Sequence, residues 1–197
     1  MLSSISPFGE RSRNSRWWLT VSAYLVGSIA GGAATGVVAG TVGAVAFLWL
    51  DAEAGLLVLA IAAAIGLAAD LGLAGLRVPS MHRQVNEDWL TTYRGWVYGA
   101  GFGFQLGLGF ATIVATSTVW LTFIAAAMTG SFVRAVLLGA LFGFARGVLI
   151  LATARINDPA SLRHLFRTIA AQAPGVNRLA RVAAGLTAIT AAAGLIA

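Results

Sequence analysis

The sequence has no cysteine, no lysine and very few charged residues. Without cysteine the chain has no disulfide, no thiol redox chemistry and no thiolate metal ligand. Charged residues make up 10% of the 197 residues, against about 25% in an average soluble domain. The two histidines, His82 and His164, fall in connecting segments, and no cluster of metal-ligating side chains accompanies them. We therefore expect no bound metal and no cofactor.

The sequence contains two long runs without a charged residue. Residues 17–50 and 95–129 carry no charged side chain, and both runs exceed the roughly 20 residues that a bilayer-spanning helix needs. These runs predict an integral membrane protein whose main partner is the lipid bilayer. A composition rich in Ala, Gly and Val, with Arg in place of Lys throughout, is typical of a GC-rich bacterial genome, so we expect the bacterial inner (plasma) membrane. The net charge of +6 falls in membrane-flanking loops, so nucleic acid is not an expected partner.

Hydropathy and turn residues predict an all-α, polytopic membrane helical bundle with about five spans. The predicted spans are residues 17–50, 54–76, 95–128, 132–154 and 179–197, with Pro79, Pro159 and Pro174 acting as breakers between them. The corresponding units are an N-terminal arm (1–16), a first transmembrane repeat (17–76), an interfacial connection (77–94), a second transmembrane repeat (95–154), a second interfacial connection (155–178) and a terminal transmembrane helix (179–197).

The arginines predict the orientation. They cluster before the first span and in the connections 77–94 and 155–178, whereas the short loop 51–54 is acidic. By the positive-inside rule the N-terminus and both long connections are cytoplasmic. If residues 17–50 crossed twice as a hairpin, the 77–94 connection would face outside. The arginine pattern therefore favours a single crossing.

The two longest runs are too long for simple spans. Thirty-four residues of helix would extend about 51 Å, whereas the hydrocarbon core is about 30 Å thick. Both runs become rich in glycine near the middle, at residues 31–36 and 99–109. These helices therefore either tilt and project beyond the membrane, or break where protein or water covers the backbone.

An internal repeat is also predicted. A long Gly-rich element, a short turn, a shorter span and an Arg/Pro-containing connection occur twice in that order. The pattern indicates two helical-hairpin repeats followed by a terminal helix. Repeats of this kind occur in transporters, and they also arise by duplication of a purely structural bundle.

Glycines at four-residue spacing predict close helix packing. Small residues at this spacing let helix backbones approach each other in lipid, so the stripes favour a tight bundle, a contact with a second copy or another membrane protein, or both. The glycines concerned are Gly27, Gly31, Gly36, Gly40, Gly99, Gly103, Gly107, Gly139, Gly143 and Gly147.

Asp70 and Arg146 are charged residues inside predicted spans. At 1.5 Å per residue, Asp70 lies about 10 Å and Arg146 about 13 Å from the cytoplasmic ends of their spans. An unpaired charge at that depth costs about 3 kcal/mol, so we predict an Asp70–Arg146 ion pair. Such a pair belongs to a substrate or proton path, or else clamps the two repeats together. Arg146 alone also has the reach to snorkel.

Uncharged polar side chains mark the third span. Gln105 lies within its Gly-rich part, and Thr112 and Thr116 follow that part. All three are candidates to line a polar path, although a Thr in a span often bonds its own backbone. Two further segments, 81–94 and 161–173, are amphipathic. They predict interfacial helices on the cytoplasmic leaflet or docking surfaces for a partner.

No enzyme motif is present, and we do not expect an enzyme. The segment 101–112, GFGFQLGLGFAT, and its weaker echo at 27–43 resemble the repeated broken helices of the CcdA/DsbD-type transmembrane proteins, a group of electron carriers and small exporters. The resemblance implies broken helices and usually six spans. The reactive cysteines of that group are missing here, so thiol electron transfer does not carry over.

Two functions follow from these patterns. The first is a small transporter or channel-like protein for a small molecule or ion, with Asp70, Arg146 and Gln105 as its polar groups. The second is a non-catalytic membrane subunit or scaffold of a larger complex. A polar, water-accessible cavity that reaches these residues favours the first, and a dry bundle covered by a partner favours the second.

Overall fold

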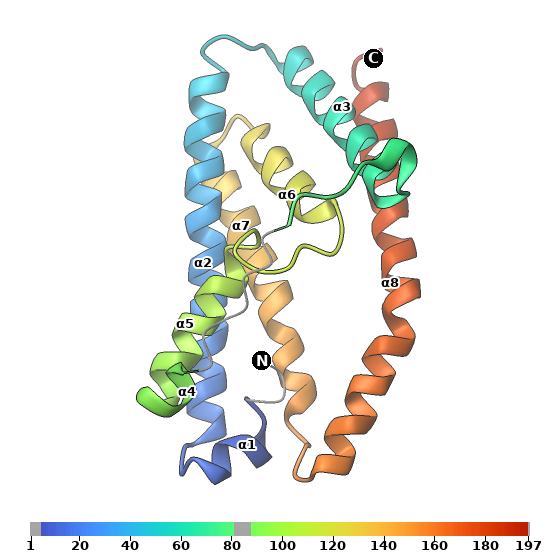
Figure 1. Ribbon diagram of the computed structural model, residues 1–197. Helices are drawn as coiled ribbons and strands as arrows, with labels where there is room; N and C mark the ends of the chain where they lie inside the picture. Colours follow the sequence, from blue (N-terminus) through green and yellow to red (C-terminus); the bar gives the residue numbers. More distant parts are fainter. Residues whose placement is uncertain (1–4, 81–87, 197) are drawn as a thin grey trace.

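The computed structural model describes residues 5–80 and 88–196, and every regular element in these two ranges is a helix. The predicted all-α fold is thereby confirmed. Figure 1 shows an elongated bundle in which α2 extends along most of the length. The elements are α1 (Pro7–Ser12), α2 (Trp17–Ala46), α3 (Ala52–Asp70), the 3-10 helix η1 (Leu73–Gly75), α4 (Trp89–Thr92), α5 (Gly95–Gly107), α6 (Thr118–Ala127), α7 (Phe132–Gly147), the 3-10 helix η2 (Val148–Thr153) and α8 (Pro159–Ala193).

Among the described residues, three helices are long and apolar enough to cross a membrane: α2, α3, and α7 continued by η2. The predicted count of five spans is therefore not confirmed. α2 contains no turn, in agreement with a single crossing of the first long run. The second long run is instead divided into α5 and α6, so the two predicted repeats differ in their helices and the repeat stays a prediction.

Glycine allows α5 and α7 to pack closely on α2. At several glycines of the three helices, an added methyl group would overlap backbone atoms of the facing helix. α5 meets successive turns of α2 in the same order and is parallel to it, whereas α7 meets them in reverse. Examples are Gly31 with Phe104, Gly103 with Tyr24, Gly107 with Ser28, Gly139 with Gly32 and Gly143 with Ser28.

All ten glycines identified by their spacing lie at these two interfaces. The stripes are thus occupied by helices of the same chain. Direct approach of the helices also allows a hydrogen bond between them, since the Ser28 hydroxyl donates to the Gly143 carbonyl oxygen at 2.7 Å.

The predicted break at Pro174 is wrong, because Pro174 lies inside helix α8. Its first turn is capped by Asp158, whose side chain accepts hydrogen bonds from the backbone N–H groups of Ala160 and Ser161. The helix then continues for 35 residues through Pro174. A proline removes one internal hydrogen bond, and α8 remains helical on both sides of Pro174. The predicted boundary between 178 and 179 thus falls inside α8.

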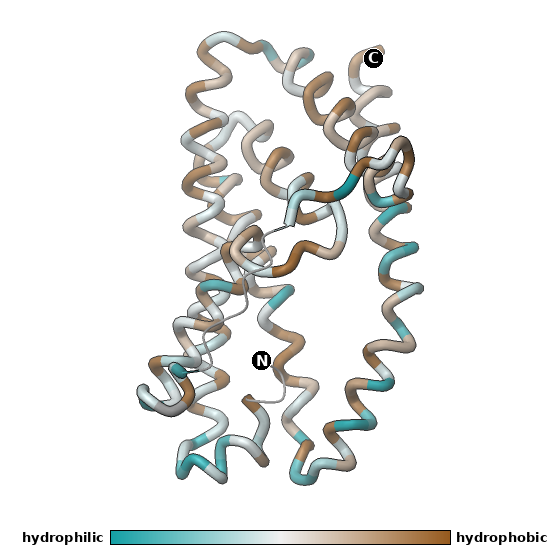
Figure 2. The backbone as a smooth tube through the Cα atoms, in the orientation of Figure 1, coloured by the Kyte–Doolittle hydropathy of each residue, from teal (hydrophilic) through white to brown (hydrophobic). Residues whose placement is uncertain are grey.

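The first half of α8 is separated from the rest of the bundle. None of residues 159–178 is buried, and Figure 2 shows hydrophilic positions concentrated along this half and in α1. The predicted amphipathic segment 161–173 is helical within it. Residues 81–87 of the other predicted interfacial segment lie outside the described residues. In the described part of that segment, residues 88–94, helix α4 packs on α5. The ring of Trp89 stacks on that of Phe102, with 6.0 Å between the ring centroids.

Candidate functional site

The second long run breaks near the middle of the bundle. Gly107 at the end of α5 lies against Ser28, and Ala127 at the end of α6 lies against Gly43. α5 therefore covers the first half of α2, and α6 covers the second. Since the 30 residues of α2 extend about 45 Å, the connection 108–117 lies roughly 20 Å from either end.

Asp70 binds the α6 side of this break. Its carboxylate accepts hydrogen bonds from the backbone N–H of Ser117 at 2.9 Å and from the Ser117 hydroxyl at 2.6 Å. Ser117 immediately precedes α6, and its own side chain does not cap the helix. The carboxylate thus takes the place of a cap and lies at the positive end of the helix dipole.

Arg146 binds the α5 side of the break. Its guanidinium donates to the carbonyl oxygen of Gly109 and to the Thr112 hydroxyl, each at 3.1 Å. It also lies 5.5 Å from the centroid of the Phe142 ring. Gly109 has a φ of 76°, a left-handed conformation that favours glycine. The connection can therefore turn and direct this carbonyl at the cation.

The predicted Asp70–Arg146 ion pair is wrong. Within residues 5–80 and 88–196 the ion pair formed is Arg13–Glu10. Asp70 and Arg146 instead bind opposite ends of the same connection. A break in a membrane helix frees backbone N–H and C=O groups that need polar partners, and these groups satisfy the two charges separately.

The structure places the other candidate residues around the same break. Thr112 accepts from Arg146, and the Thr116 hydroxyl lies 2.7 Å from that of Thr118. Thr35 of α2 donates to its own helix at Gly31 and to the carbonyl oxygen of Leu108, each at 3.2 Å. Gln105 is half-buried in α5, and its side chain forms no hydrogen bond to another described residue.

A cleft of about 740 Å³ reaches one side of the break. It lies among the end of α3, the segment after it, the connection 108–117 and the middle of α8. Its lining includes the side chains of Asp70, Arg77, Ser80, Thr116, Asn177 and Arg181. A polar cleft therefore reaches Asp70, one of the two charged side chains at the break.

A second polar cluster was not anticipated from the sequence. Glu10 of α1 is completely buried. It accepts hydrogen bonds from Arg13 at 2.8 Å, from the Thr20 hydroxyl at 2.8 Å and from the Tyr98 hydroxyl at 2.5 Å. The arm predicted at residues 1–16 therefore docks under α2 and α5 from Ile5 onward. This cluster was only weakly indicated by the sequence, because Glu10 is a single acidic residue among arginines.

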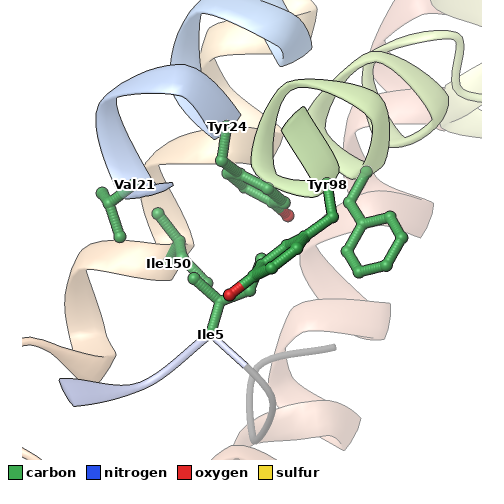
Figure 3. Close-up of a cluster of buried hydrophobic side chains, with 6 residues drawn as sticks. Ile5, Val21, Tyr24, Tyr98 and Ile150 are labelled. Atoms are coloured by element: carbon green, nitrogen blue, oxygen red, sulfur yellow. The ribbon is translucent and has the colours of Figure 1, made fainter. Parts of the chain in front are cut away.

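Apolar packing supports this docking. Figure 3 shows Ile5 beside Tyr98, with Tyr24, Val21 and Ile150 around them. The Thr153 hydroxyl donates to the carbonyl oxygen of Ile5 at 3.1 Å. Burial lowers the pKa of Arg13, but its hydrogen bonds to Glu10 and Tyr98 and the charge of Glu10 outweigh burial and raise that pKa overall. Arg13 thus stays charged at this contact.

Replacement of Glu10 by alanine is expected to release α1. Hydrogen bonds to charged groups contribute about 1.5–3 kcal/mol, so their loss exposes the backbone around Arg11 and Arg13 more often. The measurement is the rate of trypsin cleavage after these arginines in detergent-solubilised protein. Ser12→Ala is the matched control because it removes an exposed hydroxyl that donates only within α1, to the carbonyl oxygen of Gly9. Equal cleavage rates in the two variants would contradict the role of Glu10.

Comparison with known proteins finds a likeness to a bacterial protein of methylamine metabolism. The chain is 32% identical over 155 residues to the methylamine utilization protein MauF of Paracoccus versutus. The match covers 74% of this chain and 54% of that protein, so the chain spans about half the length of the relative. No family model matches the chain, and no solved structure matches it.

Proposed function

We propose that this chain is a small membrane transport protein that moves a small polar molecule or ion past the break between α5 and α6. The break itself carries the proposal. It lies midway along α2, has a charged side chain at each end, and is reached by a polar cleft. Substrate sites of many transporters form where membrane helices are interrupted at mid-depth.

The cleft supports a polar substrate. Asp70, Thr116 and Asn177 offer hydrogen-bonding groups along it, beside the guanidinium groups of Arg77 and Arg181. The name of the relative MauF refers to methylamine utilization, so methylammonium is the first solute to assay. In the proposed orientation the N-terminus faces the cytoplasm of a bacterium and the protein resides in the inner membrane.

The likeness to CcdA/DsbD-type proteins belongs to this proposal too. It is limited to an interrupted Gly-rich helix, which α5 and α6 supply. Because the chain has no cysteine, the proposed cargo is a solute rather than electrons passed between thiols.

A single introduced cysteine tests this function. Thr116→Cys is reconstituted into liposomes, and uptake of methylammonium, other small ions and uncharged solutes is measured before and after reaction with a charged, water-soluble thiol reagent. We expect reaction at position 116, because it lines the polar cleft, and loss of most uptake. The cysteine-free parent protein gives no background reaction.

Ala171→Cys provides the matched control, because residue 171 is exposed on the separate half of α8. Its reaction with the reagent is expected to leave uptake unchanged. An unreactive Thr116→Cys, together with no solute entering faster than into empty liposomes, would overturn the proposal.

One observation favours a second candidate function, that of a non-catalytic subunit or scaffold. The first half of α8 has no buried residue and exposes Phe166, Ile169 and Val176. A partner membrane protein, or a second copy, covers this half in that alternative. A stoichiometric partner that copurifies with the chain, combined with an unreactive Thr116→Cys, would select it.

A further inference from the structure

A second cleft lies at the N-terminal end of the bundle, far along α2 from the break. It has a volume of about 830 Å³ and lies between the beginnings of α2 and α5. Arg13, Arg16 and Arg94 line it together with the small polar residues Asn14 and Ser15. Among the described residues that line this cleft, none is acidic.

Two helices begin side by side at this cleft. Arg16 immediately precedes α2 and Arg94 immediately precedes α5, and neither helix has a side-chain cap. The two beginnings are in close contact, since a methyl group added to Gly95 would lie 2.5 Å from the Thr20 hydroxyl oxygen. The positive ends of two helix dipoles and their uncapped N–H groups therefore converge at one place.

Glu10, whose carboxylate lies beside Gly95, does not neutralise the cleft. Both oxygens of Glu10 are bound, one by Arg13 and Tyr98 and the other by Thr20. Arg16 and Arg94 are exposed, and their side chains form no hydrogen bond or ion pair with other described residues. Within the described residues, two guanidinium groups beside the helix beginnings thus have no acidic partner.

We infer that this cleft binds the phosphate group of an anionic ligand. Guanidinium groups bind phosphate oxygens in a bidentate manner, and uncapped helix N-termini bind the same group. Tyr93, Trp96 and Leu19 line the cleft as well, and about half of each side chain is exposed. This apolar flank suits the glycerol and acyl part of a membrane lipid, whereas a free phosphate uses only the arginines and helix ends.

The expected orientation agrees with a lipid source. The positive-inside rule places this end of the bundle at the cytoplasmic leaflet, where basic pockets between membrane helices bind anionic headgroups. Trp and Tyr side chains are also enriched at headgroup level. The inference does not depend on transport, because the cleft and the break lie on different parts of α2.

The test measures ligand-induced thermal stabilisation and native-mass-spectrometry retention of purified protein in detergent. The ligands are phosphatidylglycerol, diacylglycerol (the same apolar part without phosphate) and inorganic phosphate. We expect phosphatidylglycerol to raise Tm and diacylglycerol to leave it unchanged. The Arg16→Gln/Arg94→Gln double variant is expected to bind phosphatidylglycerol about tenfold more weakly or worse, as loss of charged hydrogen bonds implies.

Arg163→Gln/Arg167→Gln is the matched control, since it removes the same charge from exposed positions on α8. It is expected to bind phosphatidylglycerol like the parent. Saturable displacement of phosphatidylglycerol by inorganic phosphate at millimolar concentration identifies a free phosphate as the ligand, and its absence identifies the lipid. Equal losses in the two double variants, or equal stabilisation by diacylglycerol, would overturn the inference. An unchanged circular dichroism spectrum shows that both variants are folded.

Discussion

Replacement of Gly143 by alanine is expected to destabilise the bundle strongly. The added methyl group overlaps the backbone oxygen of Ser28 and lies 3.2 Å from the Cα atom of Gly32. Helices α2 and α7 must then move apart, which also stretches the hydrogen bond from Ser28 to the Gly143 carbonyl. Overpacking of this kind costs about 3 kcal/mol. The measurement is equilibrium unfolding in mixed micelles of increasing sodium dodecyl sulfate content.

The same substitution at Gly175 is the matched control. Nothing lies within 4 Å of a methyl group added there, and Gly175 is inside α8. Because alanine favours helix more than glycine does, we expect a gain of about 0.5–1 kcal/mol. A similar change in unfolding free energy for both variants would show that the α2–α7 contact does not limit stability.

Asp70→Asn and Arg146→Gln are each expected to lower the unfolding free energy by about 1.5–3 kcal/mol, because each removes hydrogen bonds to a charged group at the break. The two side chains share no partner, since Asp70 binds Ser117 and Arg146 binds Gly109 and Thr112. The double variant should therefore lose roughly the sum of the two single losses. Equilibrium unfolding in the same mixed micelles measures all three variants.

A direct ion pair predicts a different result for the double variant, which would then be little worse than the worse single variant. That outcome would contradict the separate binding described above. Arg134→Gln is the control for loss of a charge from α7. Arg134 is exposed in the first turn of that helix, as expected for a side chain that extends toward the membrane surface. Its replacement should change stability by less than about 0.5 kcal/mol.

Several features of this fold follow from local sequence alone. The uncharged run that begins at Trp17 predicts a membrane helix because the transfer of each apolar residue into lipid is favourable wherever that residue packs. The four-residue spacing of Gly139, Gly143 and Gly147 predicts a flat helix face for the same local reason. Neither argument depends on which helix lies opposite.

Other features depend on which surfaces meet. For each of the two Gly-rich runs, the sequence was compatible with a tilted helix or with a broken one. Only the second run is broken, and there Asp70 and Arg146 bind the backbone groups that the break frees. Glu10 gave almost no signal in the sequence, because its burial depends on Tyr98, which is 88 residues away in the chain.

The sequence by itself thus determined the all-helical membrane class, the uncharged runs and the glycine faces. Only the tertiary structure decided the position of the break, the separate partners of Asp70 and Arg146, the buried Glu10 and the unbroken α8. The physical reason is the range of the interactions. Hydrophobic transfer and backbone propensity act residue by residue along the chain, whereas a polar group inside a membrane protein is stabilised by whichever partner folding brings to it.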